Sequence, residues 1–342
     1  MRSDGRPLVA LTMGDPAGIG PEVVVKALNE PQVYSWCRPL VVGDAEVFRR
    51  TITALGLGLT IQVVDDPSQG RYTHGMVDLL QATGESLAGI IPGQVQARAG
   101  RAAAECVIRA AELAMAGRVD AIATAPLNKD ALNQAGYHYP GHTEMLAQLT
   151  GAHDYSLALI AGALRVVHVT THVSMRDALA LLSRERVLRM IRLADRFCRL
   201  LGIATPRVAV AGFNCHAGEN GLFGTEEIEH IQPAVADAQS EGIQVTGPWP
   251  GDTIFYRASR GEFDIVVAMY HDQGHIPIKM LGFEAGVNIT AGLPIIRTSV
   301  DHGTAFDIAG KGIANHRSMV EAIGLAARLA AGRRAARPEV QQ

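Results

Sequence analysis

Short apolar runs rich in β-branched residues alternate with longer stretches of helical periodicity along most of the chain. Parallel strands need long, usually helical, crossovers between them, so this alternation indicates repeated βα units in an α/β fold. At 342 residues the chain is long enough for two domains or one large one. Strands are expected at 8–12, 39–42, 121–124, 166–171, 208–213, 265–269 and 294–298. Helices are expected at 97–116, 176–201, 226–241 and 318–331.

The composition restricts the kind of partner. The net charge is only −3 and the basic residues are scattered, so nucleic acid is not expected. The four cysteines form no CxxC motif, which is typical of reduced thiols in a cytoplasmic protein. No apolar stretch has the length of a signal peptide or a membrane span. We therefore expect a cytoplasmic protein that acts on a small molecule.

Three histidines share one position relative to the strands. His172, His216 and His271 each come just after an expected apolar strand. If those strands lie in one parallel sheet, the imidazoles meet at the edge where ligands bind in open α/β sheets. Three imidazoles that leave coordination positions open are typical of a catalytic divalent-metal site. A single loop histidine is more often only hydrogen-bonded, but the shared position of three favours the metal site.

The last of these histidines opens a polar run, HDQGH, directly behind the strand at 265–269. Gly274 in this run predicts a glycine-hinged turn that presents polar side chains at the end of the strand. Two roles stay open for His275, orienting His271 or binding substrate. His168 lies among valines, so we expect it in the core with its hydrogen bonds satisfied.

A second group of residues suits an anion. The GHTE sequence at 141–144 precedes an apolar helical pattern, which places Thr143 at a helix N-terminus, where free amides favour phosphate or carboxylate. An ordinary N-cap is the alternative. Lys279, Asn288 and Arg297 follow downstream and are able to add charge-assisted hydrogen bonds. These residue types indicate a strongly anionic small substrate.

Two glycine-rich segments allow a ligand to approach the backbone closely. The segment 14–22, GDPAGIGPE, follows the first strand and either cradles a ligand or makes a tight βα turn. The segment 301–312 has glycines at 303, 310 and 312. No G-x-G-x-x-G fingerprint follows a strand, and the P-loop motif is absent.

Ordered motifs over nearly the whole chain resemble the 4-hydroxythreonine-4-phosphate dehydrogenase family of pyridoxal-phosphate biosynthesis. They are GDPAGIGPE, GHTE, TTH, HAGE, GDT, YHDQGHIPIK, GVNIT and GLPIIRTSVDHGTAFDIAGKG. The resemblance implies an isocitrate/isopropylmalate-dehydrogenase-like fold of two α/β/α lobes around a cleft. It places the first lobe at 1–138 plus 289–342, and the second, with the metal and the dimer interface, at 139–288. It also implies a homodimer with the site at its interface.

The resemblance assigns roles to individual residues. Metal ligands map onto His172, His216 and His271, and substrate-binding positions onto His142, Thr143, Lys279, Asn288 and Arg297. NAD contacts map onto the loop 301–312, at His302, Gly303, Thr304, Ala305 and Asp307. Lys279 is expected to transfer a proton or stabilise an enolate, and Asp252 to support the site. One divalent ion per site is implied, with zinc first and magnesium, cobalt, manganese or nickel as alternatives.

The implied reaction is NAD-dependent oxidation of the 3-hydroxyl of a 4-phosphorylated hydroxy acid, followed by β-decarboxylation. With 4-hydroxythreonine 4-phosphate the product is 3-amino-2-oxopropyl phosphate. The segments 124–129 and 219–224 look more like a second branch, which oxidises D-threonate or D-erythronate 4-phosphate to dihydroxyacetone phosphate. A cis-dihydrodiol dicarboxylate dehydrogenase is a weaker resemblance because GHTE is retained. A non-catalytic metal or phosphometabolite-binding protein and a three-histidine metallohydrolase are the alternatives from other classes.

Overall fold

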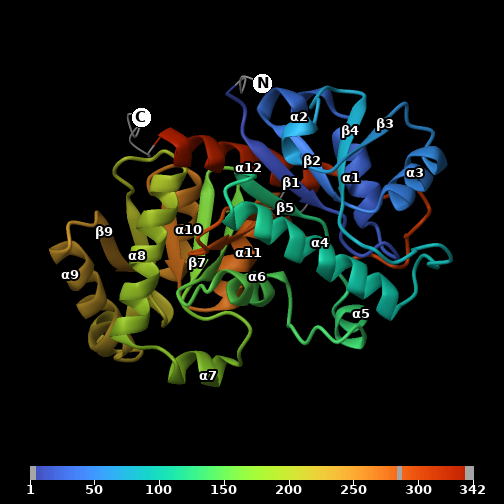
Figure 1. Ribbon diagram of the computed structural model, residues 1–342. Helices are drawn as coiled ribbons and strands as arrows, with labels where there is room; N and C mark the ends of the chain where they lie inside the picture. The colour runs from blue at the N-terminus through green and yellow to red at the C-terminus, as the bar shows by residue number, and fades with distance from the viewer. Residues whose placement is uncertain (1–4, 283–286, 336–342) are drawn as a thin grey trace. The chain divides into compact units, whose positions relative to one another are not determined.

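In the computed structural model, which describes residues 5–282 and 287–335, the chain divides into two units. Unit 1 comprises Met1–His153 with Leu293–Arg334, and unit 2 is formed around Asp154–Gly292. Each unit has a sheet whose strands are flanked by helices (Figure 1). The predicted fold class, two α/β/α lobes, is confirmed by this arrangement.

Unit 1 is built on a parallel sheet in the order β3-β4-β2-β1-β5-β12. Its strands are β1 (Leu8–Thr12), β2 (Arg38–Gly43), β3 (Thr60–Val64), β4 (Met76–Gln81), β5 (Ala121–Thr124) and β12 (Arg297–Val300). Its helices are α1 (Gly20–Leu28), α2 (Pro31–Trp36), α3 (Ala45–Ala54), α4 (Ala97–Met115), α5 (Lys129–Gln134), α6 (His142–Thr150) and α12 (Arg317–Ala335). Strand β1 is buried at every position, as expected of a parallel strand covered on both faces.

Unit 2 has the strand order β11-β6-β7-β10-β8-β9. Strands β7, β10, β8 and β9 run parallel, whereas β6 is antiparallel to both of its neighbours. The strands are β6 (Ser156–Ala161), β7 (Leu164–His168), β8 (Val208–Ala211), β9 (Val245–Trp249), β10 (Ile265–Ala268) and β11 (Val287–Ala291). The helices are α7 (Met175–Ala180), α8 (Arg184–Leu200), α9 (Gln232–Ser240), α10 (Gly251–Ser259) and α11 (His271–Gly282). A core of buried side chains from β6, β7, β8, β10, α10 and α11 holds this unit together.

The units do not divide where the resemblance places the lobe boundaries, at 138/139 and 288/289. Helix α6 packs on α4 of unit 1, so unit 1 extends to His153. Strand β11 pairs with β6, so unit 2 extends to Gly292. Residues 336–342 of the expected first lobe lie outside the described residues.

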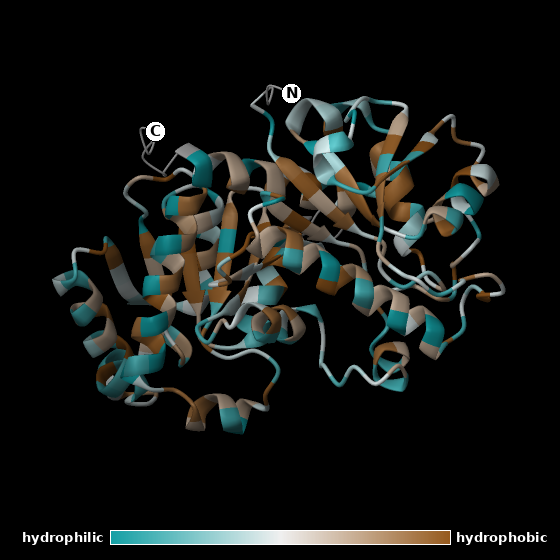
Figure 2. Ribbon diagram, in the orientation of Figure 1, coloured by the Kyte–Doolittle hydropathy of each residue, from teal (hydrophilic) through white to brown (hydrophobic). Residues whose placement is uncertain are grey.

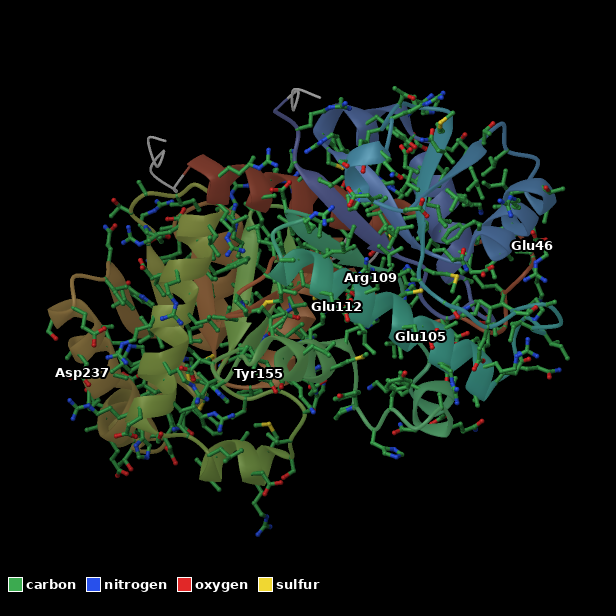
Figure 3. The ribbon with its side chains drawn as sticks, in the orientation of Figure 1. Glu46, Glu105, Arg109, Glu112, Tyr155 and Asp237 are labelled. Atoms are coloured by element: carbon green, nitrogen blue, oxygen red, sulfur yellow. The ribbon has the colours of Figure 1, made fainter. Side chains whose placement is uncertain are left out.

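The hydropathy of the elements follows their burial. Strands are mainly hydrophobic, while most helices carry both hydrophobic and hydrophilic positions (Figure 2). On α4, for example, a buried face of small apolar side chains lies opposite the exposed ion pair of Arg109 with Glu112, at 3.1 Å (Figure 3). In the part of the chain that the structure describes, no helix has both the length and the apolar character to cross a membrane.

Several expected elements differ in detail. The strand predicted at 294–298 lies at Arg297–Val300 instead. The helix predicted at 176–201 is two helices, because Ser183 caps α8 by accepting a hydrogen bond from the Arg186 amide. The helix predicted at 226–241 begins with a π-helical turn, Glu227–Ile231. Strands β3, β4, β6, β9 and β11 are not among the predicted elements.

Candidate functional site

The three strands that precede the candidate metal ligands are neighbours in one parallel sheet, as predicted. Strand β10 lies between β7 and β8, with Val266 opposite both Val166 and Ala209. The pairing continues past the strand ends, because the Val169 amide donates to the Ala268 carbonyl at 2.8 Å. The carboxyl ends of the three strands therefore meet at one edge of unit 2, and the histidine-bearing segments start there.

Two of the three histidines lie together. The ring centres of His172 and His271 are 5.6 Å apart and the rings are tilted by 45°. Two imidazoles bound to one zinc ion through bonds of about 2.1 Å at a tetrahedral angle have ring centres about 5 Å apart. The spacing of this pair therefore fits two ligands of a single ion.

A neighbouring carboxylate sets which nitrogen of His271 is available. The Nδ1 atom of His271 lies 2.7 Å from Oδ1 of Asp272, so Nε2 is left for a ligand. A carboxylate bonded to the second nitrogen is the usual way in which a metal-binding histidine is oriented. The donor chemistry of the pair thus fits a divalent ion such as zinc.

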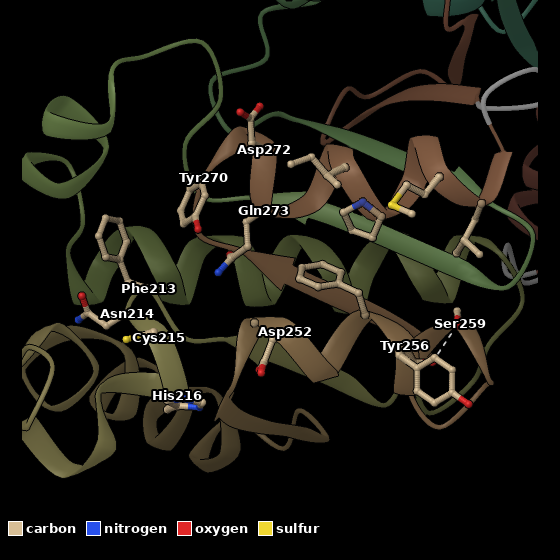
Figure 4. Close-up of a pocket in the computed structure, with 16 residues that line it drawn as sticks. Phe213, Asn214, Cys215, His216, Asp252, Tyr256, Ser259, Tyr270, Asp272 and Gln273 are labelled. Carbon is tan, nitrogen blue, oxygen red and sulfur yellow. Dashed lines mark hydrogen bonds between the residues drawn. The ribbon is translucent and has the colours of Figure 1, made fainter.

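The third candidate, His216, is not within coordinating distance of the other two. In the residues that the structure covers, no group of three His, Cys, Asp or Glu side chains is arranged to hold a metal. His216 lines a pocket of about 830 Å³ that Asp252 and Asp272 also line. His216 and Asp272 lie on opposite sides of this pocket in Figure 4. Of the three histidines predicted to form a cluster, only His172 and His271 lie together. Asp252 lies on the pocket wall nearer His216.

The backbone around His216 explains its separate position. Five consecutive residues, His216 to Asn220, have positive φ angles between 42° and 79°. Among them Gly218 adopts this left-handed conformation without cost and Asn220 tolerates it, whereas His216, Ala217 and Glu219 lose roughly 1–2 kcal/mol each. No propensity rule predicts a left-handed turn over a run such as HAGEN, so this turn was not predictable from the sequence.

The HDQGH run is a helix, not the predicted glycine-hinged turn. His271 is the first residue of α11, and Gly274 lies within that helix. A Cβ atom on Gly274 would lie 2.3 Å from Nε2 of His168 on β7. The glycine therefore allows the close packing of α11 against β7.

Helical spacing brings His271 and His275 onto one face of α11. Their rings stack with centres 3.6 Å apart and an angle of 12° between the planes. Nδ1 of His275 also lies 3.0 Å from the main-chain oxygen of His271. Of the two roles left open for His275, this geometry favours support of His271.

His168 is buried as expected, with 1% of its surface exposed, but its hydrogen bonds are not satisfied. Neither ring nitrogen makes a hydrogen bond of ordinary geometry within the described ranges, and the nearby Leu157 main chain only partly offsets the effect of burial on the His168 pKa. Burial, together with the neighbouring His275, lowers the pKa of His168 to about 3. His168 is therefore a neutral imidazole in the folded protein at physiological pH.

Gln273 is a residue of this region that the sequence analysis did not single out. Its side-chain oxygen accepts from the Met269 amide at 2.7 Å, and its side-chain nitrogen donates to the Gly212 carbonyl at 2.7 Å. Gln273 thus ties the start of α11 to the ends of β10 and β8. A glutamine inside a polar run gives no sequence signal for such a clamp.

Unit 1 contains a buried cationic site of its own. Arg297 is 3% exposed and donates from Nη2 and Nε to the hydroxyl of Thr124, at 2.7 and 3.1 Å. Burial lowers the pKa of Arg297 to about 9, and nearby Glu144 acts in the opposite direction. Thr124, which ends strand β5, was not predicted as a site residue, although a polar residue in that position is a recognisable signal.

The start of α6 completes this cationic site. His142 and Thr143 are the first two residues of the helix, as predicted for an anion-binding N-terminus. Burial and the charge of Arg297 lower the pKa of His142 well below its usual value, so its ring is neutral. Nε2 of His142 is buried and, within the described residues, has no hydrogen-bond partner. A guanidinium, a neutral imidazole and helix amides form a donor set suited to phosphate.

Lys279 and Asn288, the other two predicted substrate residues, belong to unit 2. Lys279 lies half-buried on α11. Asn288 lies on β11, and its Oδ1 atom is buried and unpartnered within the described part of the chain. The predicted substrate residues are therefore divided between the two units.

The two glycine-rich segments pack on each other within unit 1. The Ile19 amide donates to the Thr304 carbonyl at 3.0 Å, and a Cβ atom on Gly18 would lie 2.8 Å from the Thr304 side chain. Gly14 adopts φ +70°, so the first segment does form a tight turn. Both segments also line a pocket of about 420 Å³. The pocket walls include Pro16, Gly18, Pro92, Gly310, Lys311 and Gly312.

Comparison with known proteins gives consistent matches over most of the chain. Residues 35–326 match the family described as pyridoxal phosphate biosynthetic protein PdxA. D-threonate 4-phosphate dehydrogenases of Pectobacterium atrosepticum and Cupriavidus necator are each 51% identical, covering 94% and 97% of this chain and 99% of each relative. A solved structure described as 4-hydroxythreonine-4-phosphate dehydrogenase from Klebsiella pneumoniae has a TM-score of 0.88 at 50% identity, covering 95% of this chain and 99% of that one.

Replacement of Gly274 by alanine tests the packing of α11 against β7. The added methyl group meets the buried His168 ring, so we expect the free energy of unfolding to fall by about 1–3 kcal/mol. Urea unfolding followed by circular dichroism measures the change. Gly58→Ala, at a glycine with no atom within 4 Å of the added carbon, is the control and should change the value by less than about 0.5 kcal/mol. Equal effects of the two substitutions would contradict the packing role.

The depressed pKa of His168 predicts a pH dependence of stability. Between its ordinary value of 6.5 and about 3, the unfolded chain binds a proton that the folded protein does not. The free energy of unfolding should therefore fall with falling pH in this window, with His168 contributing up to ~1.4 kcal/mol per pH unit. Urea unfolding at pH 7 and pH 5 measures the slope. His168→Leu should flatten it, whereas the exposed His153→Leu should not; an unchanged slope in His168→Leu refutes the assignment.

Proposed function

Because this chain belongs to the PdxA family and is an oxidoreductase of that family, we propose that it is an NAD- and metal-dependent D-threonate 4-phosphate dehydrogenase. The reaction oxidises the 3-hydroxyl of the substrate to a β-keto acid and then releases carbon dioxide, leaving dihydroxyacetone phosphate. The observation that carries the proposal is the 51% identity, over nearly full length, to two relatives of that name. This reverses the order of the two substrates inferred from sequence, where 4-hydroxythreonine 4-phosphate came first.

The buried cationic site of unit 1 is proposed to bind the substrate phosphate. Arg297 supplies a desolvated guanidinium, and the N-terminus of α6 adds amides and the positive end of the helix dipole. Neutral His142 has a buried nitrogen available for one further hydrogen bond. A phosphate here also offsets the cost of burying the Arg297 charge.

His172 and His271 are proposed to hold a divalent ion, most simply zinc, with His216 as the third ligand. When bound, such an ion supplies Lewis-acid polarisation of the substrate oxygen. Asp272 fixes the His271 ring so that Nε2 is the coordinating atom. Asp252, on the pocket wall with His216, is proposed to support this third ligand.

The remaining roles follow the family resemblance. NAD, which accepts the hydride, is proposed to bind along 301–312 through His302, Gly303, Thr304, Ala305 and Asp307, with the adjoining pocket of about 420 Å³ for part of the dinucleotide. Lys279 is proposed to move the proton at C2 after carbon dioxide leaves. Asn288 is proposed to bind substrate through its buried Oδ1.

A homodimer is part of the proposal. Tyr256, Met280 and Leu281 line the larger pocket and are 70%, 83% and 57% exposed. Apolar side chains this exposed and this close together are typical of an association surface. We propose a cytoplasmic enzyme in which a second copy covers them.

The substrate assignment can be tested by direct competition between two acids. With zinc and NAD, D-threonate 4-phosphate should give NADH and dihydroxyacetone phosphate at a kcat/KM at least 10-fold above that for 4-hydroxythreonine 4-phosphate. A spectrophotometric NADH assay and identification of the product by mass spectrometry are the measurements. Chelation should remove the activity and zinc should restore it.

Variants of the same protein provide the controls. His271→Ala should abolish turnover, whereas His153→Ala, at an exposed histidine that is not a candidate site residue, should not. Faster oxidation of the amino acid substrate would restore the first sequence-based assignment. Phosphate release without NADH would favour a hydrolase, and the absence of any turnover would favour a binding protein.

Replacement of Arg297 tests the phosphate site. Arg297→Gln removes the buried cation, so KM for D-threonate 4-phosphate should rise roughly 10- to 100-fold, the equivalent of one charge-assisted hydrogen bond or slightly more. Steady-state kinetics with D-threonate as the unphosphorylated comparison substrate measure the effect. The loss should be confined to the phosphorylated substrate, and Arg109→Gln on the exposed face of α4 should leave both substrates unaffected. An equal loss for both substrates would place Arg297 elsewhere in the mechanism.

A further inference from the structure

Two neighbouring carboxylates contact the segment that carries His216. Glu226 accepts from Nδ2 of Asn214 at 2.6 Å, and Glu227 is the one that also binds the main chain. Glu227 is 1% exposed. Its Oε1 accepts from the Phe213 and Asn214 amides at 2.7 and 2.8 Å, and its Oε2 accepts from Nδ2 of Asn214 at 2.9 Å. The two fixed amides lie two and three residues before His216, at the point where the chain leaves β8.

The left-handed turn closes tightly around the same carboxylate. A Cβ atom on Gly218 would lie 2.6 Å from Oε2 of Glu227, and one on Gly212 would lie 3.1 Å from Oε1. The chain therefore approaches the carboxylate both before and after His216 in the sequence. Neither glycine has room for a side chain. The left-handed residues 216–220 thus follow directly on the two amides that Glu227 binds.

Glu227 is itself held in an unusual element. It begins the π-helical turn Glu227–Ile231, a type of turn that is rare and concentrated at functional sites. The next residues continue as α9, so the carboxylate is anchored in a regular helix. In the described part of the chain, no ion pair accompanies this carboxylate, and its three hydrogen bonds all run to residues 213 and 214.

We propose that Glu227 is a positioning residue for His216, one that sets where this imidazole stands relative to the His172 and His271 pair. The inference rests on the proposed function in that it takes His216 as the third metal ligand. It assigns to Glu227 an effect on metal affinity that operates only through His216.

A double-mutant cycle on zinc affinity tests this role. Isothermal titration calorimetry with zinc alone is carried out on the full chain, Glu227→Gln, His216→Ala and the double variant. Glu227→Gln places an amide donor against Nδ2 of Asn214, so zinc affinity should fall by roughly 10- to 100-fold, as for other residues that orient a metal ligand. In the His216→Ala background the same substitution should have no further effect. Glu229→Gln, at an exposed glutamate that accepts from the Thr225 hydroxyl, is the matched control and should bind zinc normally.

Hydrogen exchange over 212–224 separates positioning from general loss of structure. Glu227→Gln should speed exchange in this segment only, and Glu229→Gln should not. If Glu227→Gln does not fold, Glu227→Asp keeps the charge but cannot reach both amides, and should give the same pattern. An equal loss of zinc affinity with and without His216, or no loss at all, overturns the positioning role. Failure of the unaltered protein to bind zinc overturns the metal assignment instead, and the role of Glu227 with it.

Discussion

The parallel register of β10 between β7 and β8 is the constraint on which the candidate metal site depends. Backbone hydrogen bonds fix the carboxyl ends of these strands at one edge, and the pairing of β7 with β10 continues through Val169 and Thr170. The side chain of Gln273 then bridges the β10 end to Gly212 behind β8. Any slip of β10 along its neighbours would break these bonds and separate His172 from His271. The register of the sheet therefore determines the relative positions of the two histidines.

In unit 1 the proposed phosphate site is built around a buried guanidinium. A buried guanidinium costs several kcal/mol in desolvation even after relaxation. The Thr124 hydroxyl accepts from two of the Arg297 donors, burial lowers the pKa of Arg297 to about 9, and nearby Glu144 acts in the opposite direction. The proposed substrate phosphate would bring a further negative charge to this guanidinium. Within the described residues, Nε2 of His142 is likewise buried without a hydrogen-bond partner.

The sequence predicts the sheet strands near the site and the histidines that follow them, because apolar β-branched runs and polar strand ends are local signals. It fails where long-range contacts decide the structure. Gly274 suggests a hinge from sequence alone, and only the position of His168 on β7 shows that it is a packing contact inside a helix. Glu227 resembles one more solvated glutamate in a helical pattern, since its partners lie 13 and 14 residues earlier in the chain. Strand β9 contains Pro248, which argues against a central strand and is tolerated at the sheet edge.

The candidate metal ligands are held by two unequal kinds of support. His271 stands on a helix and is fixed by Asp272, by stacking on His275 and by the packing of Gly274 on β7. His216 stands on a left-handed turn that follows the two amides bound by Glu227. Substitutions in α11 should therefore disturb the His172 and His271 pair. Substitutions between β8 and α9 should disturb only the position of His216. His172 and His271 already lie together whereas His216 does not, so the proposed metal affinity should depend on the β8–α9 segment as well as on α11.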